Sequence, residues 1–388
     1  MLDNKIKMWL FLTTRTNISR GKLAELYRTF GSAHGILCAD KEQLSQTKLL
    51  TDEEINILLS RNDDGLDEYM HILDKNKVRV LTVECDEYPE MLRNLRSLPL
   101  VLYCRGRFID LNKYLCIASV GSRNPSSYGK RNAYNIVRNF CKEGCVLVSG
   151  MAQGIDAVSH QAAIDAGCPT VAFIATGVDI IYPKINADIY HQVVEHGMVV
   201  SEYPLGTIPK PYYFPERNRL IAGVSKGVFL SEATFKSGSA ITVSFAIEQG
   251  KDIFALPGSI ESHLSEEPNR LIKNGAYAVT DANDILLHYR DIYAQNMELG
   301  NILSTDTQTV REETDEIFVS DTSSELPDVP ENLGSEEKVE FLLKERSFDI
   351  DSISKLTKIP LSELDVILLT MEMDGRIKND NGNYYIVL

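Results

Sequence analysis

The sequence predicts an α/β fold organised around a parallel sheet that is buried on both faces. Six stretches in the middle of the chain begin with apolar residues and break at Gly, Ser, Thr or Pro, and segments of helical periodicity separate them. They are 115–123, 146–156, 171–179, 199–204, 227–232 and 253–258. Buried parallel strands have this pattern, and the loops at their carboxyl ends build the binding site in such folds.

The composition allows large cores but is acidic. The 388 residues are enough for about two or three domains, and 44% of them are hydrophobic. A formal net charge of −15 argues against nonspecific nucleic-acid affinity of the whole molecule. The charge is segregated, however. Acidic residues accumulate between Arg311 and Glu337, whereas the central stretch holds Lys184, Lys210, Arg217, Arg219 and Lys226.

The cysteines and the apolar runs bound the cellular context. The seven cysteines are scattered and form no C-x-x-C pair, so we expect neither a disulfide framework nor a metal site, and a cytoplasmic location. The apolar run Met8–Leu12 is too short to span a bilayer, and no small-residue cleavage site follows it. We interpret it as the buried face of a first helix and expect no membrane span.

Residues 1–81 predict an N-terminal helical module. Ser19 stands as a cap before apolar residues at helical spacing, and Gly31 ends that segment. Thr51 and Glu54 have the spacing of a capping box. Short helices punctuated by glycine suit a helix-hairpin-helix or SAM-like module that contacts DNA backbone or protein. A module that serves only packing is the alternative.

Residues 82–290 form the predicted core, and strands near 78–83 and 99–106 lead into its sheet. Residues 291–334 lack periodicity and are rich in Thr, Ser, Asp and Glu, which predicts an acidic flexible linker.

Residues 335–388 have the pattern of a winged helix, with three helices followed by a hairpin that turns at Asn381-Gly382. A helix that reads DNA bases needs Arg, Lys, Asn or Gln on its outer face. The third helix instead carries Glu363, Asp365, Glu372 and Asp374. We therefore expect protein contact or capping from this module rather than base reading.

The loop 121–130 is a glycine turn that opens onto a helix. It differs from the G-x-x-x-x-G-K-[ST] phosphate loop, because the spacing from Gly121 to Gly129 is too long and Arg131 follows Lys130. A G-x-G-x-x-G motif is also absent. Backbone N–H groups and Arg123 can still hold an anion at such a turn. The alternative is that Arg123 pairs with a carboxylate.

The loop 149–156 repeats this arrangement, with glycines that allow close backbone approach. Asp156 is either a helix-terminus residue or a ligand contact. His160 lies one turn further along, and we interpret it as structural.

Two further helix starts carry polar side chains. Arg217 and Arg219 bracket Asn218 directly before an apolar run, which predicts phosphate contacts at the mouth of the sheet. The second start is 237–239, with the sequence Ser-Gly-Ser. No Ser-His-Asp order, metal-spaced His cluster or isolated carboxylate pair stands out, so we expect no enzyme.

Taken in order, these motifs resemble the DNA-processing protein A family (DprA or Smf). They are Gly121-Ser-Arg123, Ser149-Gly-x-Ala-x-Gly-Ile-Asp156, Thr176-Gly-Val-Asp-x-x-Tyr-Pro183, Ser201-Glu-Tyr-Pro204, Phe214-Pro-x-Arg-Asn-Arg219, Glu232-Ala233 with Ser237-Gly-Ser239, and Ala255-Leu-Pro-Gly-Ser259. Each is weak alone, but their order and spacing make the match specific. The flanking modules also look like the three-part layout of longer members.

The resemblance implies an extended Rossmann-like core in a homodimer that needs no cofactor. It also implies a protein that binds and protects incoming single-stranded DNA and loads the RecA recombinase during natural transformation. The implied DNA-binding residues are Gly121, Ser122, Arg123, Lys184, Arg217, Asn218, Arg219, Ser237, Gly238 and Ser239, and we add Lys210 and Lys226 on charge alone. Tyr182, Tyr212, Tyr213 and Phe214 are available for base stacking, worth about 1–3 kcal/mol per base.

The sequence departs from the family at two positions. Ala175 replaces a usual glycine, and Glu267 stands where a glycine usually precedes Asn269. Glu267 is expected to add negative charge near the rim, or simply to remodel a turn.

Two other functions compete. One is a nucleotide-hydrolysing relative of the Rossmann-like phosphoribohydrolases, but 235–242 lacks the glycines of their Pro-Gly-Gly-x-Gly-Thr-x-x-Glu loop. The other is an adaptor whose terminal modules bind protein partners.

Overall fold

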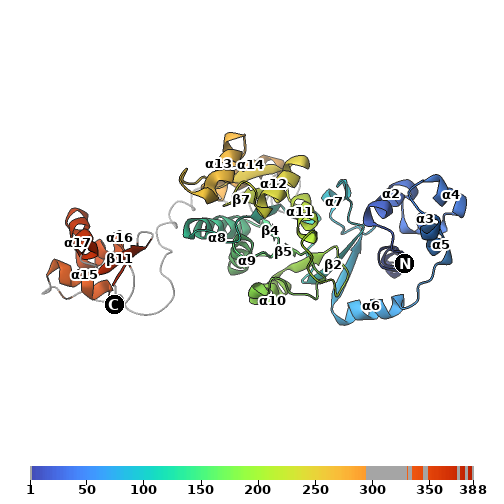
Figure 1. Cartoon of the computed structure of the whole chain (residues 1–388), viewed down its shortest axis with the longest axis horizontal. Helices are drawn as coiled ribbons and strands as arrows, with labels where there is room; N and C mark the ends of the chain where they lie inside the picture. The colour runs from blue at the N-terminus through green and yellow to red at the C-terminus, as the bar shows by residue number, and fades with distance from the viewer. Residues whose placement is uncertain are drawn as a thin grey trace. The chain divides into compact units, whose positions relative to one another are not determined.

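The computed structural model describes residues 2–293, 330, 334–343, 348–373, 376–380 and 383–386. The chain divides into two compact units, Met1–Thr305 and Asp306–Leu388 (Figure 1). Most of the predicted linker 291–334 lies outside the described residues.

The first unit is built on a nine-stranded sheet with the order β1-β2-β6-β5-β4-β3-β7-β8-β9. The strands are β1 (Val78–Thr82), β2 (Val101–Gly106), β3 (Cys116–Val120), β4 (Val146–Ser149), β5 (Thr170–Phe173), β6 (Met198–Ser201), β7 (Gly227–Leu230), β8 (Asp252–Ala255) and β9 (Tyr277–Ala278). In this order the neighbours from β6 through to β9 pair in parallel, whereas β1–β2 and β2–β6 pair antiparallel. The predicted α/β fold with a mostly parallel sheet is confirmed.

Helices cover both faces of this sheet, because both faces carry apolar side chains. Along β3, Ile117 belongs to one core and Cys116 and Ala118 to the other, as the alternation of side chains along a strand requires. Helices α8 (Ser127–Lys142), α9 (Ile155–Asp165) and α14 (Asn283–Tyr293) contribute to the first core, and α11 (Tyr213–Val224) and α12 (Gly238–Glu248) to the second. The remaining helices of this region are α7 (Glu90–Arg93), α10 (Ala187–His196) and α13 (Glu266–Lys273).

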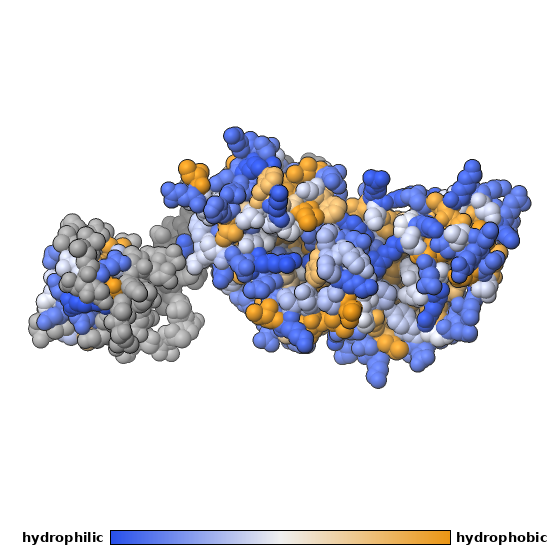
Figure 2. Space-filling model, viewed as in Figure 1, coloured by the Kyte–Doolittle hydropathy of each residue, from blue (hydrophilic) through white to orange (hydrophobic). Residues whose placement is uncertain are grey.

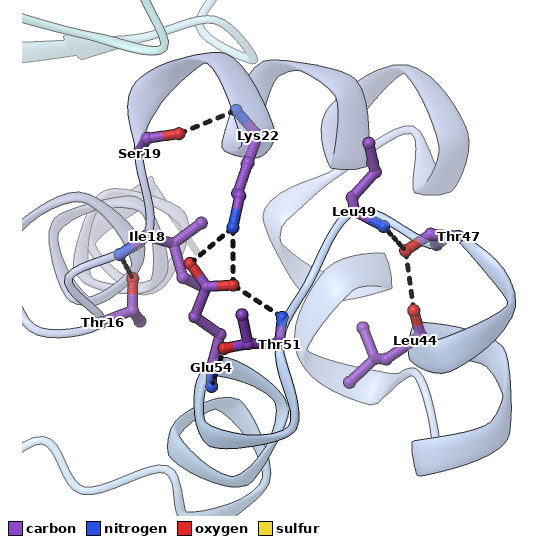
Figure 3. Close-up of polar contacts among 9 residues, drawn as sticks. All are labelled: Thr16, Ile18, Ser19, Lys22, Leu44, Thr47, Leu49, Thr51 and Glu54. Atoms are coloured by element: carbon purple, nitrogen blue, oxygen red, sulfur yellow. Dashed lines mark hydrogen bonds and ion pairs between the residues drawn. The ribbon is translucent and has the colours of Figure 1, made fainter.

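Six short helices precede the sheet: α1 (Leu2–Thr14), α2 (Arg20–Phe30), α3 (Ala33–Cys38), α4 (Lys41–Gln46), α5 (Asp52–Ser60) and α6 (Leu66–Lys75). Figure 3 shows how α2 and α5 begin. The Ser19 hydroxyl accepts from the Lys22 N–H, and Thr51 and Glu54 form the predicted capping box. Lys22 Nζ lies 2.8 Å from Glu54 Oε2, so one ion pair joins the first turns of both helices.

The helical bundle packs directly on the antiparallel edge of the sheet. Trp9 of α1 is fully buried, and its Nε1 donates to Glu84 Oε1 at 2.9 Å. The same oxygen accepts from the N–H of Ala33 at 2.7 Å. The predicted boundary after residue 81 falls inside β1, whose last residue is Thr82. The division into domains stays a prediction.

The second unit has its own core. Its elements are α15 (Ser335–Leu343), β10 (Phe348–Asp349), α16 (Ile350–Thr357), α17 (Leu361–Met373), β11 (Ile377–Asp380) and β12 (Asn383–Ile386), with the antiparallel strand order β10-β12-β11. Val339, Ile353 and Leu364 are fully buried among its helices. Glu363 and Glu372 of α17 are exposed. The predicted turn Asn381-Gly382, Asp374 and the side chain of Asp365 lie outside what the structure describes.

None of the helices in the described ranges is long and apolar enough to cross a membrane. On the face shown in Figure 2, apolar residues of the first unit gather in separate small groups among hydrophilic ones.

Replacing Glu84 tests the junction between bundle and sheet. Glu84→Ala leaves the Trp9 and Ala33 N–H groups without their acceptor, so the free energy of unfolding should fall by about 1–3 kcal/mol. Glu84→Gln keeps an oxygen at this place and should lose less. Urea unfolding followed by the fluorescence of Trp9, the single tryptophan, measures both. Equal stability of the alanine variant and the wild type would contradict the assignment.

Candidate functional site

A cavity of about 700 Å³ opens at the carboxyl ends of the parallel strands. Its walls are the loops that follow β3, β4 and β5, together with the first turns of α11 and α12. This is the edge of the sheet at which the sequence predicted a site, and it is the usual position of ligand sites in open α/β sheets.

The loop after β3 needs its first glycine and presents its arginine to solvent. A Cβ atom at Gly121 would lie 2.7 Å from Ile155 Cγ1 and 2.8 Å from Ser231 Oγ. Ser122 and Arg123 line the cavity, and Arg123 is exposed. Within the described residues no carboxylate lies within ion-pair distance of Arg123. Anion binding by Arg123 stays a prediction.

The start of α8 is occupied by a carboxylate of the protein itself. Glu232, which follows β7, is buried, and its Oε2 accepts from the Ser126 N–H at 2.8 Å. The Ser126 hydroxyl donates to Glu232 Oε1 at 2.5 Å and accepts from the Gly129 N–H at 3.1 Å. Glu232 and Ser126 therefore take up two N–H donors at this helix start, those of Ser126 and Gly129. Anion binding by the other groups of the turn stays a prediction.

The loop after β4 is folded around Asp156. This carboxylate accepts from the N–H groups of Gly150 at 3.1 Å and Ala152 at 3.2 Å. Burial raises the pKa of Asp156, and the nearby charge of Arg217 opposes that shift. Gly154 adopts a φ of 86° close to the backbone oxygens of Ser122 and Arg123, where a side chain would clash. Asp156 thus lies in the first turn of α9, lines the cavity and holds the loop in shape.

Arg217 forms the floor of the cavity. It is 5% exposed, and its Nη1 donates to the carbonyls of Gly150 and Phe173, the latter at 2.5 Å. A Cβ atom at residue 150 would overlap with Nη1, so Gly150 is required beside the guanidinium. Burial lowers the pKa of Arg217 to about 10, which still leaves the side chain charged at neutral pH.

Arg219 does not lie at the mouth of the sheet. It is 8% exposed, it is absent from the cavity walls, and its Nη2 donates to Glu202 Oε2 at 2.5 Å. Two residues along a helix correspond to a rotation of about 200° around its axis, so the side chains of Arg217 and Arg219 lie on opposite faces of α11. Asn218 does line the cavity, and its amide donates to the Gly238 carbonyl at 3.2 Å.

The hydroxyl-rich start of α12 completes the wall. Ser237, Gly238 and Ser239 all line the cavity. The Ser237 hydroxyl caps α12 by accepting from the Ala240 N–H and lies 2.9 Å from the Ser239 hydroxyl.

The three predicted lysines have different positions. Lys184 is exposed in a short 3-10 helix directly after Tyr182 and Pro183, which line the cavity. Lys210 is exposed, and its Nζ lies 5.6 Å from the centre of the Tyr213 ring. Lys226 precedes β7 and therefore lies at the amino ends of the parallel strands, opposite the cavity. Its closeness in sequence to the other cations did not translate into closeness in space.

Two aromatic rings form part of the rim. Tyr182 and Phe214 both line the cavity, with ring centres 5.6 Å apart, and Tyr182 is 45% exposed. Tyr212 is also exposed, whereas the ring of Tyr213 packs against the ring of Tyr203, with ring centres 4.1 Å apart.

The two departures from the family pattern are buried. Ala175 lines the cavity and is almost fully covered. Glu267 is 3% exposed, and its Oε1 lies 2.6 Å from Arg270 Nη2. Arg270 offsets the negative charge of Glu267, and the effect of Glu267 on DNA contact or on the turn stays a prediction.

Some contributors were not singled out by sequence reasoning. They are Gln153 and Thr234, which line the cavity. Glu232, which sequence reasoning named only within the family motif, holds the first loop of the cavity. Glu232 lies two residues after the apolar run that ends at Leu230, a position similar to that of Arg123 after its own apolar run.

The structure places His160 away from the cavity wall. It is fully buried, with Nδ1 2.8 Å from the Thr170 hydroxyl, as expected of a structural histidine. Burial lowers the pKa of His160 to about 3, so the ring is neutral at physiological pH. In the described part of the chain, no group of three or more His, Cys, Asp or Glu side chains is placed to hold a metal ion.

Several known proteins are similar to this chain. The family model of DNA recombination-mediator protein A matches residues 79–290. The DNA processing protein DprA of Bacillus subtilis is 39% identical over 208 residues, covering 54% of this chain and 70% of the relative. Protein Smf of Escherichia coli K12 is 31% identical over 387 residues, covering 99% and 96%.

Two solved structures are similar as well. The X-ray structure of DprA from Streptococcus pneumoniae matches with a TM-score of 0.59 and 31% identity over 72% of this chain and 97% of that one. The structure of DprA from Helicobacter pylori, described for its unique single-stranded DNA binding mode, matches with a TM-score of 0.51 and 29% identity over 55% and 97%.

Gly129→Ala tests the cap of α8 by Glu232. The new Cβ would overlap with Glu232 Oε2 and would push the carboxylate away from Ser126, so stability should fall by about 1–3 kcal/mol. Gly21→Ala is the matched control in the first turn of α2, with open space around its Cβ, and should stabilise by about 0.4–1 kcal/mol. Chemical unfolding followed by circular dichroism separates the two. A neutral Gly129→Ala change would rule out a tight cap.

The lowered pKa of His160 predicts that the protein loses stability in mild acid. The unfolded chain binds a proton near the ordinary histidine pKa of 6.5, whereas the folded protein does not until the pH approaches the lowered pKa of about 3. The unfolded state therefore gains protons first as the pH falls from 6.5 towards 3, and stability decreases in that window. The decrease from pH 7 to pH 5 should be about 2 kcal/mol.

His160→Gln should remove the part of the dependence of stability on pH that comes from His160. The raised pKa of Asp156 makes a contribution of opposite sign in both proteins, so it cancels when the stability of the variant is subtracted from that of the wild type. Urea unfolding at several pH values measures it. Parallel pH profiles for the two proteins would show that His160 does not cause the slope.

Proposed function

The chain belongs to the DNA recombination-mediator protein A family, and from that premise we propose that it binds single-stranded DNA in the cavity at the carboxyl ends of β3, β4 and β5. The bound strand serves DNA processing, the role that the names of the relatives give, and recombination, the role that the family name gives. The proposal extends to natural transformation, which the family resemblance implies. The proposed contacts are those of the predicted set that lie on or beside the cavity: residues 121–123, Lys184, Arg217, Asn218 and 237–239.

One observation carries the proposal. Arg123 stands exposed on the cavity wall with no carboxylate partner among the described residues, and a second guanidinium, Arg217, forms the floor. Lys184 extends this positive charge beside the rim. Cations arranged along a groove bind a phosphate backbone and release its counterions, which makes the affinity depend on salt.

The aromatic rim supports a single strand as the ligand. Tyr182 and Phe214 line the cavity, and unpaired bases stack on aromatic rings without regard to sequence. In a duplex the base faces are covered by their neighbours. Tyr212, exposed beside Lys210, offers a further ring.

Arg219 and Lys226 leave the proposed contact set. Arg219 is engaged with Glu202, and Lys226 lies at the opposite edge of the sheet. We add Lys210, exposed beside the rings of Tyr212 and Tyr213, to the proposed contacts as an outer one.

We propose binding without catalysis. The carboxylates nearest the cavity, Asp156 and Glu232, accept hydrogen bonds from N–H groups of the loops that they hold. Their contacts explain the shape of the loops. The proposal includes a cytoplasmic homodimer that loads RecA on the bound strand, which the family membership implies.

The second unit is proposed to be a winged-helix module. Its element order α15-β10-α16-α17-β11-β12 and its strand order β10-β12-β11 support this. Exposed Glu363 and Glu372 on α17 would repel phosphates, so we propose that it contacts protein.

Single-strand binding by charge variants tests the proposal. Arg123→Ala and Lys184→Ala should each weaken binding of a labelled oligothymidine. Each should also reduce the slope of log affinity against log salt by about 0.7 for every phosphate that the protein no longer neutralises. Lys226→Ala removes the same charge at the opposite edge and should leave affinity unchanged. Fluorescence anisotropy across a salt series measures all three.

Wild-type affinity in both Arg123→Ala and Lys184→Ala would contradict the proposed site. Equal losses in all three variants would indicate attraction by net charge alone.

A further inference from the structure

Helix α11 has two faces with different contacts. Phe214, Arg217 and Asn218 face the cavity. Tyr213, Glu216 and Arg219, spaced three residues apart, contact instead the two residues that follow β6, Glu202 and Tyr203. Whatever holds Glu202 and Tyr203 therefore sets the position of the cavity face.

These two residues hold α11 at three successive positions. Glu202 Oε2 accepts from Arg219 Nη2 at 2.5 Å. The Tyr203 hydroxyl donates to Glu216 Oε2 at 2.8 Å, and its ring lies 4.1 Å from the Tyr213 ring. Glu202, Tyr203 and Arg219 are buried, so water competes little for the contact between Glu202 and Arg219. Glu216 is exposed, and its bond to Tyr203 is only partly buried.

Arg20, the first residue of α2, holds the same pair from the side of the N-terminal helices. Its Nη2 donates to the Glu202 carbonyl at 3.3 Å, and its Nη1 lies 3.6 Å from Glu202 Oε2. Its Cζ lies 4.3 Å from the centre of the Tyr203 ring, in cation–π geometry. Glu202 thus lies between two guanidinium groups, one from the bundle and one from α11.

We propose that Arg20 is a positioning residue for the DNA cavity. Through Glu202 and Tyr203 it fixes α11, and with it Phe214 and Arg217. The N-terminal helices therefore set the affinity of a site in which they supply no wall. This inference rests on the proposed binding of single-stranded DNA.

The chemistry requires an arginine. A guanidinium donates in its plane to Glu202 while its flat face covers the Tyr203 ring. A lysine supplies the charge but neither the fork nor the flat face. Without Arg20, α11 samples more conformations, and ordering it on binding costs affinity.

Lys22 provides a matched control two positions further along α2. It is also a cation in an ion pair, but its partner Glu54 is part of the bundle, as Figure 3 shows. Lys22→Ala disturbs the bundle and leaves the contacts to Glu202 and Tyr203 in place.

The test is oligothymidine binding by anisotropy at one salt concentration. Arg20→Ala should weaken binding on the order of tenfold, Arg20→Lys should recover part of that loss, and Lys22→Ala should bind like the wild type. The fluorescence of Trp9, buried in the bundle, confirms that each variant is folded. In a Tyr203→Leu background, Arg20→Ala should have little further effect, because the two act on the same helix.

Three outcomes overturn the inference. Wild-type affinity in Arg20→Ala rejects it while leaving the DNA site intact. Equal losses in Arg20→Ala and Lys22→Ala show damage to the bundle in place of positioning. No binding by the wild type itself removes the proposed function, and the inference falls with it.

Discussion

A buried guanidinium fixes the geometry of the cavity. Burying a charge costs several kcal/mol unless polar groups of the protein replace the lost water. Arg217 donates to the carbonyls of Gly150 and Phe173 and lies near the charge of Asp156, and these groups replace its water. This solvation joins the loop after β4, the end of β5 and helix α11 at one point. Residue 150 must be glycine beside it, and the loop must fold back so that Asp156 lies close.

The first loop follows a different principle from nucleotide-binding loops. In those, the N-terminus of a helix is open and holds a phosphate. Here Glu232 and Ser126 take up two N–H groups at the start of α8. Under the proposed function, anion binding falls to side chains that line the cavity, above all Arg123. The loop 121–130 lacks the phosphate-loop signature. In the structure, the buried carboxylate of Glu232 takes a position at the start of α8 that a phosphate loop leaves open for its ligand.

The sheet could be predicted from the sequence because burial on both faces leaves continuous apolar runs, and the caps at Ser19 and Thr51 follow from local hydrogen bonds. Helical geometry alone would have separated Arg217 from Arg219, and strand direction would have placed Lys226 at the opposite edge. The contacts of Glu202 were beyond such reasoning, because they join residues 17 and 182 positions apart. Only the fold shows which distant side chains meet.

A crystal structure of the protein with a short oligothymidine tests the central claim most directly. We expect the strand in the cavity after β3, β4 and β5, with a phosphate within hydrogen-bond distance of Arg123 and a base on the ring of Tyr182 or Phe214. A strand bound elsewhere on the described surface, with the cavity empty, would contradict the assignment of the site.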